Sequence, residues 1–185
     1  MNSGSANSEG RTSSEGTMII RARQPGDIDA CIALLADVHA ADSYPLNWPA
    51  NPPVWLTSDD LLAAWVVEHE SRLVGHVSLC SAASESSASL WSSACDVPPE
   101  QLAVIARLFA APSARGHGVG SALLVVACDE ARSRGLRPVL DVLDLNQSAM
   151  ALYERQGWLR VGSVPAPWAR MDGREHFLHY YVAPQ

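Results

Sequence analysis

One short segment near the middle of the chain constrains the fold more than any other. Residues 115–124 read RGHGVGSALL, so three glycines alternate behind an arginine and an apolar helical pattern begins straight after them. Residues 102–112, just before, have the apolar composition of a strand that Pro112 ends. The helix is expected to run to about Arg134, with Gly135 as its stop. This order leaves bare backbone amides at a helix start, which favours an anionic ligand.

Three kinds of ligand are held by glycines ahead of a helix: a nucleoside triphosphate, a dinucleotide, or another pyrophosphate such as that of coenzyme A. A P-loop requires G-x-x-x-x-G-K-[ST], and no lysine follows the glycines here. The dinucleotide fingerprint G-x-G-x-x-G belongs to the first strand of a βαβ unit. Here several predicted elements come first, and Ser121 follows Gly120. Both of these readings are therefore excluded.

The other hydrophobic patterns alternate between strand and helix periods, without internal repeats. They predict the order β-α-α-β-β-β-α-β-α-β-β, which is an α/β or α+β domain with a mixed sheet. Residues 43–57 hold four prolines and three aromatics and are expected to form a long loop, as are the small polar residues 84–100. The other predicted strands are residues 18–24, 64–70, 73–82, 138–144, 158–164 and 175–183, and the other predicted helices are residues 25–38, 58–64 and 148–156.

Two motifs in the second half of the chain resemble those of the Gcn5-related N-acetyltransferase (GNAT) family. Residues 115–120 match the family's acyl-CoA motif [QR]-x-x-G-x-[GA], between a strand and a helix. Residues 140–158, LDVLDLNQSAMALYERQGW, are similar to its strand-N-x-x-A-x-x-L-Y-x-x-x-G-[FW] segment. The motifs cover about residues 102–162, and between residues 18 and 94 only the element order agrees. The resemblance implies a GNAT-like mixed, mostly antiparallel central sheet of about six to seven strands flanked by about four helices.

Acetyl-CoA is the expected co-substrate, and the glycine turn is its expected phosphate site. The amides of the three glycines and of Ser121 can hold the pyrophosphate, with charge added by Arg115 and His117. The resemblance implies further that the preceding strand binds the pantetheine amides through its backbone, and that Asn146 contacts the pantetheine arm. Within that strand, Phe109 is expected to point into the core. The predicted cofactor-binding set is Leu108, Phe109, Ala110, Arg115, Gly116, His117, Gly118, Val119, Gly120, Ser121 and Asn146.

The resemblance implies an N-acetyltransferase that moves an acetyl group from acetyl-CoA to a primary amine of a small molecule or peptide. The amine would attack directly in a ternary complex. Tyr153 is the expected catalytic residue, because the family places this tyrosine beside the CoA sulfur as a general acid. An alternative is a non-catalytic acyl-CoA-binding module that senses or scaffolds. The general base stays open among four side chains, Glu68, His76, Asp141 and His176.

The acceptor site is expected at the proline-rich loop, where the family roofs it. Tyr44, Trp48 and Trp55 can form an apolar or cation–π wall there, or pack the loop onto the core. Residues 52–100 carry seven carboxylates against the single cation Arg72. This imbalance favours an amine-bearing acceptor.

Composition limits the other functions. The formal net charge of −7 argues against nucleic-acid binding. Residues 1–17 are Ser/Gly-rich and are expected to be a disordered tail without a secretory signal, ahead of a single domain at residues 18–185. No apolar run approaches the ~18 residues of a membrane span. Scattered cysteines favour reduced thiols in the cytoplasm, and the histidines lack metal-ligand spacing. The oligomeric state stays open, with a homodimer as one option.

Overall fold

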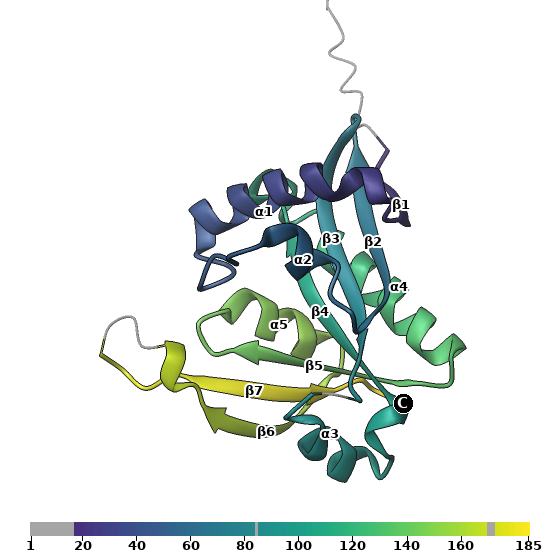
Figure 1. The fold of residues 1–185 in the computed structure, drawn as a ribbon, viewed down its shortest axis with the longest axis vertical. Coiled ribbons are helices and arrows are strands. Elements are labelled where there is room, and N and C mark those ends of the chain that lie inside the picture. The colour runs from purple at the N-terminus through teal and green to yellow at the C-terminus, as the bar shows by residue number, and fades with distance from the viewer. Residues whose placement is uncertain (1–16, 84, 170–172) are drawn as a thin grey trace, which may run out of the picture.

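The computed structural model describes residues 17–83, 85–169 and 173–185, and these residues form one seven-stranded sheet (Figure 1). The strand order is β1-β2-β3-β4-β5-β7-β6, and every neighbouring pair is antiparallel except β4 with β5. The predicted mixed, mostly antiparallel sheet is confirmed. The strands are β1 (Ile19–Ala22), β2 (Leu61–His69), β3 (Arg72–Ser81), β4 (Leu102–Ala110), β5 (Arg137–Leu143), β6 (Leu159–Pro165) and β7 (Phe177–Val182).

Five α-helices accompany the sheet within the described residues. Helices α1 and α2 cross one face of the β2–β4 half, and α4 covers the opposite face (Figure 1). Helix α3 packs against β6 and β7. The predicted tail, residues 1–17, lies outside the described residues apart from Thr17, and the division into a tail and one domain stays a prediction. The helices are α1 (Ile28–Asp42), α2 (Pro52–Leu56), α3 (Ala88–Cys95), α4 (Val119–Ser133) and α5 (Gln147–Arg155).

Strand β3, between β2 and β4 in the sheet, is buried without interruption from Val74 to Cys80. Both of its faces are covered, so it shows no polar alternation. Gly75 allows α4 to approach closely. A Cβ at this position would lie 2.6 Å from Val119 Cγ1 and 2.9 Å from Leu123 Cδ1. The start of α4 is therefore set by direct contact with β3.

The predicted helix at residues 58–64 is wrong, because Leu61–Ala64 begin strand β2. Ser58 and Asp59 resemble a helix cap, yet the following residues pair with β3, as Leu61 with Cys80 and Ala63 with Leu79. A long antiparallel hairpin gains more from this pairing and burial than four residues gain from a capped helical turn.

The proline-rich segment, expected to be a long loop, contains helix α2. Pro52 and Pro53 occupy its first positions, where a missing N–H leaves no bond unmade. Asn51 caps the helix by accepting a hydrogen bond from the Val54 amide at 3.3 Å. Leu56 is fully buried and anchors α2 to the core.

The predicted loop at residues 84–100 contains helix α3. Its serines and alanines carry little periodic signal, and a single large side chain holds it in place. Trp91 is 1% exposed, donates from Nε1 to the Leu140 carbonyl at 3.3 Å, and meets the Tyr180 ring edge-on at 5.2 Å. This tertiary contact fixes a segment that local propensity leaves undecided.

Candidate functional site

The glycine turn joins β4 to α4 and presents open backbone. Gly116 and Gly118 have positive φ angles of 77° and 79°, and no atom lies within 4 Å of where a Cβ would stand on either. Their bare surface and the first amides of the 15-residue helix α4 fit a phosphate group. Gly120 has a different role, because its Cβ would lie 3.3 Å from Leu152 Cδ2 of α5. The third glycine therefore allows α4 and α5 to approach.

Charge around this turn is partly neutralised by α1. Arg115 forms two hydrogen bonds with the Asp42 carboxylate, one of them at 3.0 Å, so the cation is tied to the last residue of that helix. His117 is exposed and its Nδ1 lies 2.9 Å from the Arg115 carbonyl. Asp42 was not among the predicted site residues. A shallow groove of about 530 Å³ begins at Gly118 and Ser121 and follows α4.

Strands β4 and β5 part just beyond their first residues. They pair only from Leu102 with Arg137 to Val104 with Val139, although β4 continues to Ala110. The far end of β4 therefore has backbone groups that β5 does not take up. Leu108 and Ala110 are half-buried there, at the entrance to the glycine turn. This is where the sequence expects the pantetheine arm.

A β-bulge interrupts β4 at the same point. The register slips by one residue between the pairs His76–Phe109 and Ser78–Ala106, and Arg107 adopts a positive φ of 53°. The Phe109 ring is buried and stacks on His76 at 4.9 Å, which confirms its core position. A bulge turns strand direction locally and re-aims side chains. It does so here where the two strands part.

His76 holds the bulge in place. Its Nε2 accepts from Arg23 Nη1 at 2.8 Å, so its Nδ1–H donates to the Arg107 carbonyl at 2.9 Å. Burial lowers the pKa of His76 to about 4, and the ring is neutral near pH 7. Because both ring nitrogens are engaged, His76 positions β4 and is not available as a base.

Tyr153 lies on α5, buried at 6% exposure among Trp158 and Tyr181, whose ring centroids are 6.0 and 5.9 Å away. Burial raises the pKa of its phenol, so the group stays protonated. Its hydroxyl makes no hydrogen bond with the described residues. Asn146 is the N-cap residue of α5. Its backbone carbonyl accepts hydrogen bonds from the amides of Ala149 and Met150, and its side chain does not cap the helix. Both side chains have polar groups left for a ligand.

Two carboxylates lie near each other close to the point where the strands part, Asp141 on β5 and Glu85 within its electrostatic range. Asp141 is solvent-accessible, yet surrounding protein partly desolvates it. This desolvation, together with the Glu85 carboxylate, raises the pKa of Asp141 to about 6. The phenols of Tyr44 and Tyr153 both lie within electrostatic range of Asp141. Of the four candidate bases, Asp141 is the one that lies near Tyr153 in this way.

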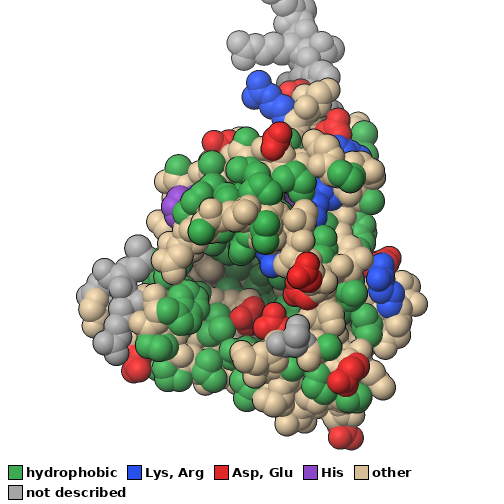
Figure 2. Space-filling view, viewed as in Figure 1, with side chains coloured by type: hydrophobic (Ala, Val, Ile, Leu, Met, Phe, Trp, Pro, Cys, Tyr) green, Lys and Arg blue, Asp and Glu red, His purple; other side chains and the backbone are tan. Residues whose placement is uncertain are grey.

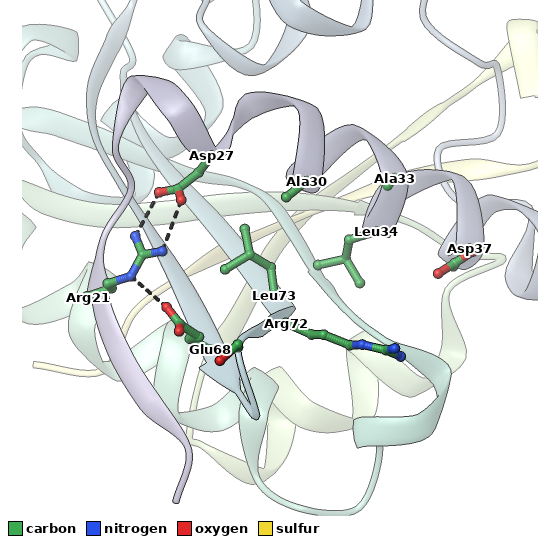
Figure 3. Close-up of a pocket in the computed structure, with 10 residues that line it drawn as sticks. Arg21, Asp27, Ala30, Ala33, Leu34, Asp37, Glu68, Arg72 and Leu73 are labelled. Carbon is green, nitrogen blue, oxygen red and sulfur yellow. Dashed lines mark hydrogen bonds and ion pairs between the residues drawn. The ribbon is translucent and has the colours of Figure 1, made fainter.

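The remaining candidate bases are held elsewhere. His176 pairs with Asp144 at 3.0 Å. Glu68 lies in a groove of about 470 Å³ between α1 and the β2–β3 turn (Figure 3). There Arg21 bridges Glu68 at 3.1 Å and Asp27 at 2.7 Å, and these hydrogen bonds raise the pKa of Arg21. The network connects β1 to the start of α1, and each of its three charged side chains has a partner within it.

The three aromatic residues of the proline-rich loop do not form one wall. Tyr44 packs against Phe109, with ring centroids 6.3 Å apart. Trp48 is 41% exposed and meets His39 of α1 edge-on at 5.3 Å. Trp55 is half-buried with the Arg107 guanidinium 5.1 Å from its ring centroid. Figure 2 shows a hollow on this face, with basic atoms on one wall and acidic side chains along its lower edge.

Arg107 and Arg23 were missed by the sequence reading. Arg107 could have been found in the sequence because it is a cation inside the otherwise apolar strand LAVIARLFA. A charged side chain is rarely buried unless it has a partner or a function. Within the described residues, no group of His, Cys, Asp and Glu is arranged to hold a metal ion, and no helix is long and apolar enough to cross a membrane.

Comparisons with known proteins identify solved structures of the same fold. The chain resembles the N-acetyltransferase of Staphylococcus aureus Mu50, at 17% identity over 90% of this chain and 97% of that one, with a TM-score of 0.71. It also resembles NAA60 of Arabidopsis thaliana in complex with a bisubstrate analogue, at 20% identity over 90% and 97%, with a TM-score of 0.69. The structure of yncA from Salmonella typhimurium holds its cofactor acetyl-CoA and is similar at 20% identity over 89% and 92%, with a TM-score of 0.66.

At these identities the structural likeness shows the fold alone. A search of curated proteins found no match. A family model described as "Acetyltransferase (GNAT) family" matches residues 33–158, which is more than half of the chain, and it confirms the resemblance seen in the two motifs. The chain belongs to the GNAT acetyltransferase family.

Proposed function

We propose that the protein is an acetyl-CoA-dependent N-acetyltransferase that acts on a primary amine of a small molecule or peptide. The observation that carries the proposal is the opening between β4 and β5. The unpaired end of β4 leads into the open glycine turn, and Asp141 lies on β5 two residues beyond the last β4–β5 pair, with the Tyr153 phenol within electrostatic range of Asp141. Acetyl-CoA supplies an acetyl group activated as a thioester.

In this proposal the chain binds the cofactor through backbone. The amides at the start of α4 and the bare Gly116 and Gly118 hold the pyrophosphate, while the unpaired end of β4 and the Asn146 side chain bind the pantetheine arm. Arg115 adds charge at the turn, in competition with its bond to Asp42. Backbone N–H groups at the bulge polarise the thioester carbonyl.

Two side chains move protons. The amine nitrogen forms a bond to the carbonyl carbon as the carbon–sulfur bond breaks. Asp141, whose pKa of about 6 leaves it ionised at neutral pH, takes the proton that the amine loses. Tyr153 remains protonated because burial raises its pKa, and it donates its O–H to the departing thiolate. Solvent restores the proton to the phenol and removes it from Asp141.

The direct test is thiol release from acetyl-CoA across a panel of amines. Tyr153→Phe is expected to lower kcat by about 10²-fold, the lower end for loss of a positioned acid, with little change in the KM of acetyl-CoA. Tyr181→Phe is the matched control, because this neighbouring phenol donates to Glu154 at 3.2 Å. Tight CoA binding without turnover of any amine would instead favour the acyl-CoA-binding sensor or scaffold. Equal rates for Tyr153→Phe and the parent across pH 6–9 would remove Tyr153 from the chemistry.

A further inference from the structure

The structure leaves three buried polar side-chain atoms of the described residues without a hydrogen-bond partner, namely Ser58 Oγ, Ser78 Oγ and Arg107 Nε. Two of these residues, Ser58 and Arg107, lie beside one thiol. Arg107 Nη1 lies 3.2 Å from Cys80 Sγ, and Ser58 lies beside the same sulfur. Ser78 is two residues before Cys80 on the same strand face, and it pairs with Ala106, the residue before Arg107. Buried polar atoms are normally satisfied, so such a cluster needs an explanation.

The guanidinium of Arg107 has one edge unused. Nη1 is directed at the weak acceptor Cys80 Sγ, and one face of the group is covered by the Trp55 ring. Neither Nε nor Nη2 donates to any described residue. Nε itself is buried, whereas Nη2 is not among the buried unpartnered atoms, so the N–H donors of Nη2 remain accessible on this half-buried residue. A charge-assisted hydrogen bond from such a donor suits a carboxylate.

Positive charge around Arg107 is not compensated locally. Arg23 lies on the other side of His76, and burial lowers the pKa of Arg23, with the Arg107 charge adding to this effect. Among the described residues neither arginine forms an ion pair with a carboxylate. A chain with a net charge of −7 thus keeps two cations close together, and the acid that acts on Arg23, Asp27, is already paired with Arg21. Such a position favours an anionic ligand.

The acidic groups lie within reach of the same space. Tyr44 is within electrostatic range of both Arg107 and Asp141, so a cation and a carboxylate both lie near one aromatic ring. Glu85 lies close enough to Asp141 to raise its pKa. A small molecule between them would meet a positive group at one end and negative groups at the other. An amine with its own carboxylate has the matching charges.

We propose that Arg107 binds the carboxylate of the acceptor, and that the acceptor is a small amine bearing a carboxylate, of the amino-acid type. The carboxylate accepts from Nη2 of Arg107, beside the Trp55 ring that covers one face of the guanidinium, and the amine is directed toward Asp141. The proposal rests on the proposed acetyl transfer for the identity of the reacting group. It adds the part of the acceptor that gives binding energy and specificity.

Matched pairs of amines test the proposal, because an amino acid and its decarboxylated counterpart differ only in the carboxylate. Full-length protein is assayed for thiol release with phenylalanine against phenethylamine and with leucine against isoamylamine. We expect kcat/KM to favour the carboxylate member by about 10- to 100-fold, the value of one charge-assisted hydrogen-bonding pair. In Arg107→Gln this preference is expected to disappear, and Arg107→Lys keeps part of it because the charge remains on a donor of different length and geometry.

Arg72→Gln is the matched control, because it removes an exposed cation at the β2–β3 turn, away from the hollow. It should keep the preference. Arg107→Gln retains an unbranched side chain at the positive-φ position, so backbone strain is unchanged. If it nevertheless fails to fold, calorimetry on the CoA-loaded parent protein compares phenylalanine with phenethylamine directly. Tighter binding of phenethylamine, or equal binding, would overturn the proposal.

The remaining outcomes separate this inference from the proposed function. Turnover of amines without any preference for the carboxylate refutes the Arg107 subsite and keeps the transferase. Absence of turnover on every amine, with tighter binding of the carboxylate member, keeps the subsite and refutes the transfer. An equal loss on both members in Arg107→Gln, with the preference kept, shows that Arg107 serves only to shape β4.

Discussion

Gly75→Ala tests whether contact between β3 and α4 sets the position of the glycine turn. The new Cβ would lie 2.6 Å from Val119 Cγ1 and 2.9 Å from Leu123 Cδ1. The first of these is about 1 Å shorter than the 3.5–4.0 Å optimum between carbon atoms. Val119 directly follows Gly118 at the start of α4, so relief of the clash moves the amides that are proposed to hold the pyrophosphate.

The magnitude combines two opposing effects. Overpacking a core costs about 1–3 kcal/mol, while replacing a glycine stabilises by about 0.4–1 kcal/mol through the unfolded chain. We expect a net loss of about 1–2 kcal/mol in the free energy of unfolding. For a chain of this size the melting temperature then falls by about 2–8 °C. CoA binding should weaken in addition, because displacement of a site by about 1 Å reduces its function by up to 10²-fold.

Gly26→Ala is the matched control, because no atom lies within 4 Å of its Cβ position and its φ is not positive. It should be neutral or slightly stabilising, so the two substitutions are expected to have opposite signs. Urea unfolding measures stability, and isothermal titration calorimetry with CoA measures the site. A Gly75→Ala protein with parental stability and CoA affinity would refute the link between β3 packing and the turn.

Two further predictions separate residues that the sequence treated together. Trp55→Ala is expected to raise the acceptor KM by about 2- to 30-fold, the value of a cation–π contact. Trp48→Ala should leave the KM of the acceptor and that of acetyl-CoA unchanged, and equal effects of the two substitutions would contradict the geometry. For Asp141, kcat/KM should rise with pH through about 6 as the carboxylate ionises, and Glu85→Gln should move this rise to lower pH, while Asp141→Asn should lack it. Because folding raises this pKa from 3.8 to about 6, the loss of stability from ionisation builds up between about pH 4 and 6 and is complete above that range. Asp141→Asn should therefore melt at a higher temperature than the parent at pH 8 and at the same temperature near pH 3.

The elements that the sequence predicted correctly are those with strong local signals. The β2–β3 hairpin, the glycine turn and α4 all have regular apolar spacing and a marked end, and the structure confirms them. Helix α3 was missed because its stability comes from Trp91 in the core and not from its serines and alanines. The false helix at residues 58–64 had a cap signal that strand pairing overrode.

For the site, the motif located the turn but not the separate roles of its glycines. Two have positive φ, and Gly120 lacks a side chain because Leu152 approaches it. A sequence motif shows only glycine at each position, whether the cause is a positive φ angle or a close approach by another side chain. The motif also could not show which side chains are buried. His76 is a plausible base by residue type, yet it is 0% exposed in the structure. Arg107 is the clearest case, because its conformation depends on a register slip between two strands.

That register slip links the two halves of the proposed reaction. The extra residue in β4 gives Arg107 its left-handed conformation and places its guanidinium under Trp55. The same residue lies just past the point where β4 and β5 stop pairing, so the proposed cofactor-binding end of β4 and the proposed acceptor-binding cation belong to one stretch of strand. His76 donates to the carbonyl of this residue and is itself fixed by Arg23. A buried, neutral histidine between two arginines is costly in isolation, and it is explained here because it holds the backbone on which both substrates are proposed to meet.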